Sequence, residues 1–110
     1  MTGKPFRDGP AYITDASDDL YNPGAGTIAD VTQIHLANTS ASAITVQLYI
    51  GLTGAETGGT EIYDHEIPAN DTDDIYFPGG LPLTSSDYLV GDASTTNVVT
   101  ATVIGSLRVA

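Results

Sequence analysis

The stretch that decides the fold is Ala43-Ile44-Thr45-Val46-Gln47-Leu48-Tyr49-Ile50-Gly51. Its aliphatic residues occupy every second position, and polar residues or tyrosine stand between them. A period of two places the two sets on opposite faces of a β-strand, whereas a helix would scatter both sets around its surface. The stretch therefore predicts a strand with one face buried in a core.

A second strand is predicted just before it, over Val31 to Asn38, with Ile34 and Leu36 facing inward. Only five residues, 38–42, join the two stretches, which favours a hairpin between them. Residues 30–33 break the alternation, and this break indicates a β-bulge near Thr32.

Further short strands are expected at residues 61–67, 74–77, 88–90 and 97–109, separated by turns. The glycine-rich stretch 51–60 is interpreted as a hairpin tip, and residues 78–83 as a turn. The last strand is apolar on both faces, so it is either central in a sheet or covered by a partner chain.

Six or seven short strands in a chain of 110 residues predict one all-β domain, a two-sheet antiparallel sandwich. The topology is jelly-roll or immunoglobulin-like, and the pattern leaves both open. The sequence contains no Trp and no Cys, the residues that mark immunoglobulin domains. No stretch combines helical periodicity with helix caps, so little helix is expected.

The first 26 residues are rich in glycine and proline, with one short strand-like run at 11–14. We interpret residues 1–26 as an extended N-terminal arm outside the core, followed by the β-sandwich domain at 27–110. The arm carries four candidate partner-binding residues, two basic and two aromatic: Lys4, Phe6, Arg7 and Tyr12. An arm of this kind can order on a partner and cover a large area.

Charge excludes several functions. Fourteen acidic residues against three Lys and Arg give a net charge of −11, which repels nucleic acid and anionic lipid. We therefore expect no nucleic-acid partner and no membrane partner. The absence of cysteine excludes disulfides, thiolate zinc sites and cysteine nucleophiles. The first twenty residues lack the apolar run of a secretory signal.

Catalytic and metal-binding motifs are weak. His35 and His65 lack metal-ligand spacing, and a triad drawn from Ser85, His65 and Asp64 has no nucleophile elbow or oxyanion loop. We therefore predict no enzyme activity and no cofactor. The best metal candidate is a calcium site in the turn at 70–74, with three carboxylates, Asp71, Asp73 and Asp74. A solvated turn is favoured over that site, so no metal is expected.

The aromatic residues permit a carbohydrate-binding interpretation, in which exposed rings stack on sugars. The sequence has six Tyr, two Phe and no Trp, the strongest stacking residue. Tyr49 and Tyr63 are the best candidates for such a face. Cross-strand packing or a protein interface explains them equally well.

Two segments carry a resemblance to a known class of proteins: Val31-Thr32-Gln33-Ile34-His35-Leu36-Ala37-Asn38-Thr39-Ser40 with Ile44 to Ile50, and Ile67-Pro68-Ala69-Asn70-Asp71-Thr72 with Gly80-Leu81-Pro82-Leu83 and Asp87-Tyr88-Leu89. Over residues 28–107 the chain resembles small β-sandwich virion proteins of tailed bacteriophages. These include capsid decoration (cement) proteins, head–tail connector components and tail proteins.

The resemblance implies a virion protein with no catalytic residues, assembled symmetrically and often contacting its partners through terminal arms. It favours a capsid decoration protein, a trimer or other homo-oligomer bound to the major capsid protein or another virion protein. A tail or connector component is the alternative from the same particle, and a carbohydrate-binding module is the alternative from another class.

Overall fold

The computed structural model describes residues 3–51 and 61–110, so the predicted hairpin tip at 51–60 lies almost wholly outside the described residues. The described residues form eight β-strands and no helix. The strands are β1 (Lys4–Tyr12), β2 (Asp18–Tyr21), β3 (Thr27–Asn38), β4 (Ile44–Gly51), β5 (Glu61–Ile67), β6 (Thr72–Leu83), β7 (Tyr88–Ala93) and β8 (Val99–Val109). In this part of the chain, no helix long and apolar enough to span a membrane occurs.

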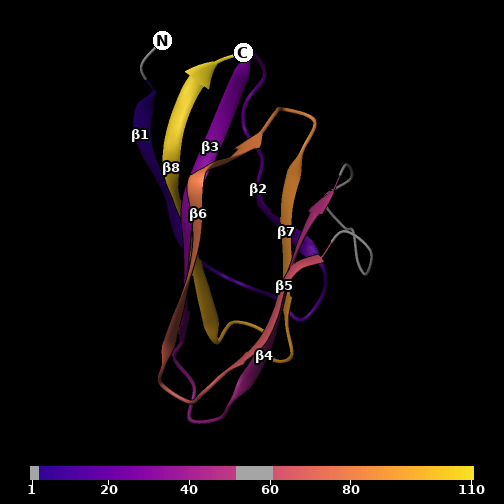
Figure 1. Ribbon diagram of the computed structural model, residues 1–110. Coiled ribbons are helices and arrows are strands. Elements are labelled where there is room, and N and C mark those ends of the chain that lie inside the picture. Colours follow the sequence, from indigo (N-terminus) through magenta and orange to yellow (C-terminus); the bar gives the residue numbers. More distant parts are fainter. Residues whose placement is uncertain (1–2, 52–60) are drawn as a thin grey trace.

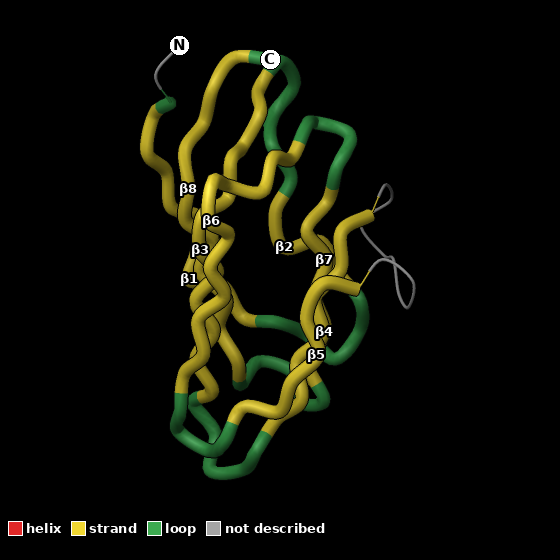
Figure 2. Tube along the Cα trace, in the orientation of Figure 1, coloured by secondary structure: helices red, strands yellow, loops and turns green. Residues whose placement is uncertain are grey.

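The strands form two four-stranded antiparallel sheets that face each other (Figures 1 and 2). Sheet I has the order β1-β8-β3-β6, and sheet II has the order β2-β7-β4-β5. The prediction of an all-β two-sheet sandwich is therefore confirmed. It follows from the alternation of apolar and polar residues, which gives each sheet one face to bury.

The strand pairing is nested. β1 pairs with β8, β2 with β7, β3 with β6 and β4 with β5, as in one long hairpin whose two arms are rolled together. Rolling adds the contacts of β3 with β8 and of β4 with β7. Eight strands wound in this way make a jelly roll, one of the two topologies that the sequence left open. β1 begins and β8 ends at the same end of the sandwich (Figure 1).

The predicted hairpin between residues 31–38 and 43–51 is wrong. β3 belongs to sheet I and β4 to sheet II, so the short connection between them crosses from one sheet to the other. The connection is held by Asn38, whose side chain is 2% exposed. Its amide donates to the carbonyls of Ser42 and Ile67, and its Oδ1 accepts from the backbone N–H of Ser40. These bonds satisfy a buried polar group and fix the crossing.

The bulge predicted near Thr32 is confirmed. The pairing of β3 with both β6 and β8 shifts between Val31 and Gln33. On β6, Tyr76 pairs with Gln33 and Leu81 pairs with Val31. The four residues 77–80 of β6 therefore lie opposite the single residue Thr32 of β3. The turn predicted at 78–83 is thus an irregularity inside one long strand. Gly79 and Gly80 there have positive φ angles of 84° and 87°, which glycine adopts without strain.

The core fills the space between the sheets with aliphatic side chains from both inner faces. The largest fully buried side chains are Ile13, Ile34, Leu36, Leu48, Ile67, Leu83, Leu89, Val31, Val46, Val90, Val99 and Val103. β8 lies between β1 and β3, so the final strand is central in its sheet, one of the two explanations given for its two apolar faces.

The prediction that residues 1–26 stay outside the core is wrong. β1 is an edge strand of sheet I and β2 is an edge strand of sheet II. Between them, Ile13 is 0% exposed and belongs to the core, and its backbone bonds to Val99 and Asn97. The glycines and prolines of this segment suit edge strands, where an irregular backbone costs few ladder bonds.

Candidate functional site

Three of the four residues predicted to bind a partner are exposed on β1. Directly paired residues of an antiparallel sheet share a face. Arg7 pairs with Ile104 and Tyr12 pairs with Thr100, so both side chains lie on the outer face of sheet I. Tyr12 is 54% exposed. Lys4 is also exposed, near the end of the same strand.

Phe6, the fourth predicted residue, points between the sheets. Its ring stacks on Tyr21 of β2, with ring centroids 5.2 Å apart and planes at 20°. Both rings are partly buried and pack against the core. This stack joins β1 to β2, so it closes the β1–β2 side of the sandwich. The structure therefore gives Phe6 an internal contact that the sequence analysis did not anticipate.

The outer face of sheet I contains a further exposed aromatic residue, Tyr76, which the sequence analysis missed. Tyr76 is 64% exposed and lies on β6, at the opposite edge from β1. It pairs with Gln33, which pairs with Ile104, which pairs with Arg7, so these four residues form one row across the sheet. The alternation in the predicted strand 74–77 was the available signal for its outward position.

A polar network lies beside this row on the same face. The Nδ1 atom of His35 is 2.7 Å from Oδ1 of Asp74, and the amide of Gln33 donates to the same oxygen over 2.9 Å. The hydrogen bond with His35, followed by that from Gln33, lowers the pKa of Asp74 below its usual value. Asp74 is thus held on the outer face by two side-chain hydrogen bonds that favour its ionised form.

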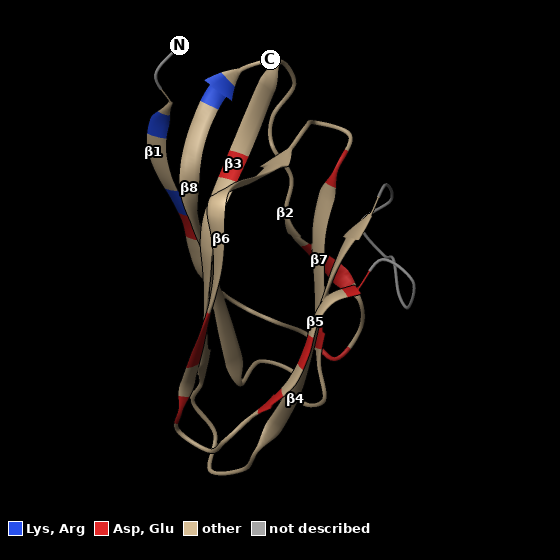
Figure 3. Cartoon of the chain, viewed as in Figure 1, with Lys and Arg blue, Asp and Glu red and all other residues tan. Residues whose placement is uncertain are grey.

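Charge divides the two sheets (Figure 3). All three cations of the chain lie on β1 and β8 of sheet I, together with four acids on that sheet's strands. The strands of sheet II carry six acids and no cation within the described residues. Arg108 is paired with Asp30, with Nε 2.7 Å from Oδ2. Sheet I is therefore nearly neutral, and sheet II is strongly acidic.

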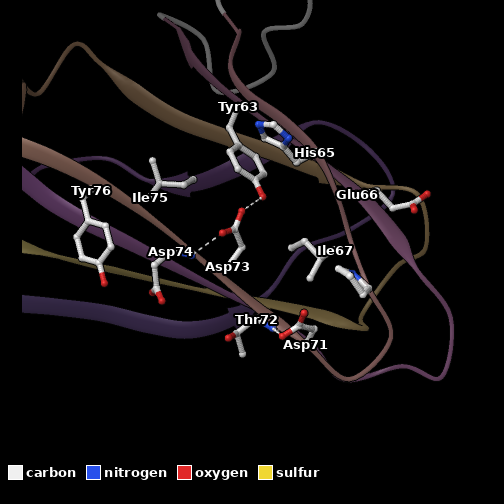
Figure 4. Close-up of a pocket in the computed structure, with 11 residues that line it drawn as sticks. Tyr63, His65, Glu66, Ile67, Asp71, Thr72, Asp73, Asp74, Ile75 and Tyr76 are labelled. Carbon is white, nitrogen blue, oxygen red and sulfur yellow. Dashed lines mark hydrogen bonds between the residues drawn. The ribbon is translucent and has the colours of Figure 1, made fainter.

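A cleft opens on the β5–β6 side of the sandwich (Figure 4). It has a volume of about 540 Å³, and its lining comes from residues 63 and 65–68 on one side and 71–76 on the other. The hydroxyl of Tyr63 donates to Asp73 and so links the two sheets. Burial, followed by this hydrogen bond to Asp73, raises the pKa of Tyr63 above its usual value.

The three carboxylates proposed for calcium are dispersed by the strand. Asp73 accepts from Tyr63, whereas Asp74, the next residue, bonds with His35 on the outer face. Asp71 accepts from the backbone N–H of Thr72. Within residues 3–51 and 61–110, no three acidic, His or Cys side chains lie close enough to hold a metal ion together.

The two tyrosines proposed for sugar stacking are not exposed. Tyr49 is 3% exposed and Tyr63 is 8% exposed, so neither offers a flat ring to solvent. Tyr63 belongs to the core, where its ring also contacts His65 at 4.8 Å between centroids. The prediction of an exposed aromatic face at these positions is wrong. The register of β4 and β5 shifts between Leu48 and Tyr49, a bulge that the alternation did not reveal.

The hydrolase-like combination of Ser85, His65 and Asp64 is not supported by the strand geometry. His65 and Asp64 are consecutive residues of β5, so their side chains point to opposite faces. Asp64 therefore does not orient the imidazole of His65. Ser85 lies in the turn between β6 and β7, where its carbonyl accepts from Asn22.

Comparison with known proteins identifies a structural likeness only. No family model matches the chain, and no curated protein matches it. Among solved structures, the fold is similar to part of a chain in the structure of infectious bursal disease virus, Gx strain, with a TM-score of 0.52 and 14% identity. A structure of the Gt strain of the same virus matches with a TM-score of 0.32 and 11% identity.

The Gx match covers 98% of this chain and 31% of the viral chain, so this chain spans about a third of the length of its structural neighbour. A match at 14% identity shows a shared all-β fold.

Proposed function

We propose that this chain is a non-enzymatic structural protein of a virus particle, a decoration protein on the outer surface of a tailed-phage head. The observation that carries the proposal is the jelly roll itself, which aligns over 98% of its length with part of a chain in a virus structure. Because one fold serves many functions, the choice of a phage and of decoration rests on the sequence resemblance of residues 28–107.

The outer face of sheet I is the proposed docking face, bearing Arg7, Tyr12, Ile104 and Tyr76. Tyrosine and arginine supply much of the binding energy at protein interfaces. All three cations lie on this sheet, so it is the side of the chain that meets a protein surface with the least repulsion. The proposed partner is the major capsid protein or another virion protein, bound by a homo-oligomer, with a trimer favoured.

Particles made with and without this chain test the proposal by electron microscopy. A decoration protein predicts that heads and tails form without it, that an outer protrusion is missing, and that added purified chain restores it. If the particles instead lack tails or fail to retain DNA, the chain is a tail or connector component. Normal particles that never bind the chain would refute both virion roles.

The docking face is tested by the double substitution Tyr12→Ala and Tyr76→Ala. Losing two exposed aromatic anchors should lower the affinity for particles at least ten-fold, which corresponds to about 1.4 kcal/mol. The matched control is Ile62→Ala, which removes a side chain that is 37% exposed on sheet II. Full occupancy by the double variant would show that another face docks.

A carbohydrate-binding module remains the candidate of another class, since jelly rolls also occur in lectins. It would need a face other than Tyr49 and Tyr63, because both are buried. Retention on a glycan array that survives Tyr12→Ala and Tyr76→Ala would favour it over the virion role.

A further inference from the structure

We infer that the β5–β6 side of the sandwich binds an extended, cationic segment of another protein, which adds as a strand beside the first half of β6. This surface adjoins the outer face of sheet I at Tyr76. The inference concerns the kind of segment that the chain binds, and it does not depend on the virion role.

The open edges of the two sheets differ in how well they could accept a strand. An edge strand offers unpaired N–H and C=O groups, and proteins commonly block such edges with proline. β1 is blocked by Pro5 and Pro10, and β6 is blocked from Pro78 onward. β2 has only four residues. β5 and residues 72–77 of β6 contain no proline, so among the described strands they are the two long edges left open to pairing.

These two edges border the cleft of about 540 Å³ (Figure 4). Residues 71–76 line it without a break, so a strand added beside β6 would run along its length. Successive side chains of a strand point to opposite faces. One set from the added strand would therefore enter the cleft above Tyr63 and Asp73, and the other set would lie beside Tyr76 on the outer face of sheet I.

Charge excludes a second copy of this chain as the added strand. The open edges carry five acids and no cation: Glu61, Asp64, Glu66, Asp73 and Asp74. Pairing β5 or β6 with the same edges of another copy would place acids opposite acids, which is unfavourable. The cations Lys4 and Arg7 of another copy lie on β1, where Pro5 lacks the N–H that strand addition needs.

The acidic residues that line the cleft specify the occupant. Arg or Lys at alternate positions of an extended segment would lie near the exposed carboxylates of Glu66 and Asp71 at the cleft. Charged hydrogen bonds between guanidinium and carboxylate are stronger than neutral ones. The exposed ring of Tyr76 at the cleft adds a surface on which a cation can stack.

The test uses the full chain and a synthetic seven-residue peptide, capped at both ends, in which Arg alternates with Val and Thr. A second peptide replaces two of its neutral residues by Pro, so that charge is kept and strand pairing is lost. We expect the first peptide to bind at least ten-fold more tightly than the second. We also expect the backbone amides of residues 72–77 to shift in NMR spectra and to gain protection from hydrogen exchange.

Two charge-matched variants locate the site. Glu66→Gln with Asp71→Asn removes two carboxylates at the cleft, and Asn at position 71 can still accept from Thr72. Asp15→Asn with Asp18→Asn removes two carboxylates that lie neither at the cleft nor on the open edges, and Asn at position 18 can still accept from Asp19. We expect the cleft variant to weaken peptide binding at least five-fold and the control variant to change it less than two-fold. Equal weakening by both variants, equal binding of the proline peptide, or amide shifts away from β6 would overturn the inference.

Discussion

Tyr63 on β5 donates a hydrogen bond of 2.5 Å to Asp73 on β6, and so ties the edge strand of one sheet to the edge strand of the other. Tyr63→Phe removes this bond and leaves the part-buried carboxylate without its partner. A hydrogen bond to a charged group contributes about 1.5–3 kcal/mol, so the free energy of unfolding should fall by about 1.5 kcal/mol in urea denaturation at pH 7. Tyr76→Phe, at a residue that is 64% exposed, is the control and should change stability little.

The effect of Tyr63→Phe on the free energy of unfolding should depend on pH above pH 10. The pKa of Tyr63 is raised in the folded chain, first by burial and then by Asp73. Its contribution to stability is therefore fully present below the unfolded tyrosine pKa of about 10 and is lost as pH rises above it. The stability gap between the wild type and Tyr63→Phe should narrow above pH 10 in urea titrations at pH 8 to 11. A constant gap would contradict the raised pKa.

Asp74 gives the opposite pH dependence. Its pKa is lowered from 3.8, first by the hydrogen bond with His35 and then by that from Gln33. A lowered pKa contributes stability that is present above 3.8 and is lost as pH falls through the folded value. At pH 6, Asp74→Asn should be less stable than the wild type by at most about 1 kcal/mol, because the pair is partly exposed. At pH 3 the two proteins should have nearly equal unfolding midpoints, and an undiminished difference would count against this assignment.

Gly105 on β8 pairs with Val31 of β3, directly beside the bulge in β3. A Cβ there would lie 2.2 Å from the backbone oxygen of Asp30 and 2.9 Å from Cα of Val31. Because both contacts are backbone atoms, Gly105→Ala should cost about 3 kcal/mol and lower Tm by more than about 10 °C. Gly24→Ala has no atom within 4 Å of the new methyl group and should leave the Tm unchanged in the same calorimetric scan.

Phe6 and Arg7 are neighbours on β1 with different predicted effects. Phe6→Ala removes the stack on Tyr21 and a contact with the core, so it should lower the free energy of unfolding by about 2 kcal/mol. Arg7→Ala, at an exposed position, should change it by less than about 0.5 kcal/mol and instead weaken docking. Equal stability of the two variants in urea would show that the stack contributes little.

Much of the sandwich was predictable because its strands bury one face. The alternation at 43–51 and the unbroken run at 61–67 closely match β4 and β5, and the broken alternation at 30–33 marks the bulge at Thr32. These signals are local: each depends only on which residues of one strand face the core.

Strand partners were less predictable, because jelly-roll pairing is mostly non-local. The pairs of Lys4 with Leu107 and of Thr27 with Val109 join residues far apart in the sequence, and no local pattern encodes them. The nearest apolar strand therefore looked like the hairpin partner of β4, although β4 pairs with β5 and β7.

The N-terminal strands were missed for a related reason. An edge strand loses few ladder bonds to proline, so Pro5 and Pro10 are tolerated in β1 although they suggest a loop in the sequence. The stack of Phe6 on Tyr21 likewise joins two strands of different sheets and has no sequence pattern. In the candidate site, the exposed positions of Lys4, Arg7 and Tyr12 were predictable from residue type. The cleft was not, because it depends on how β5 and β6, edge strands of different sheets, lie relative to each other.

Nested pairing also orders events during synthesis on the ribosome. β1 is synthesised first, yet its pairing partner β8 is synthesised last. β3 also pairs with β8, so it too lacks a neighbouring strand until the chain is complete. An unfinished chain therefore carries apolar strands with no closed interior to receive them, the kind of species that aggregates. All fourteen acids precede residues 99–109, so unfinished copies on neighbouring ribosomes repel one another while β8 is still missing.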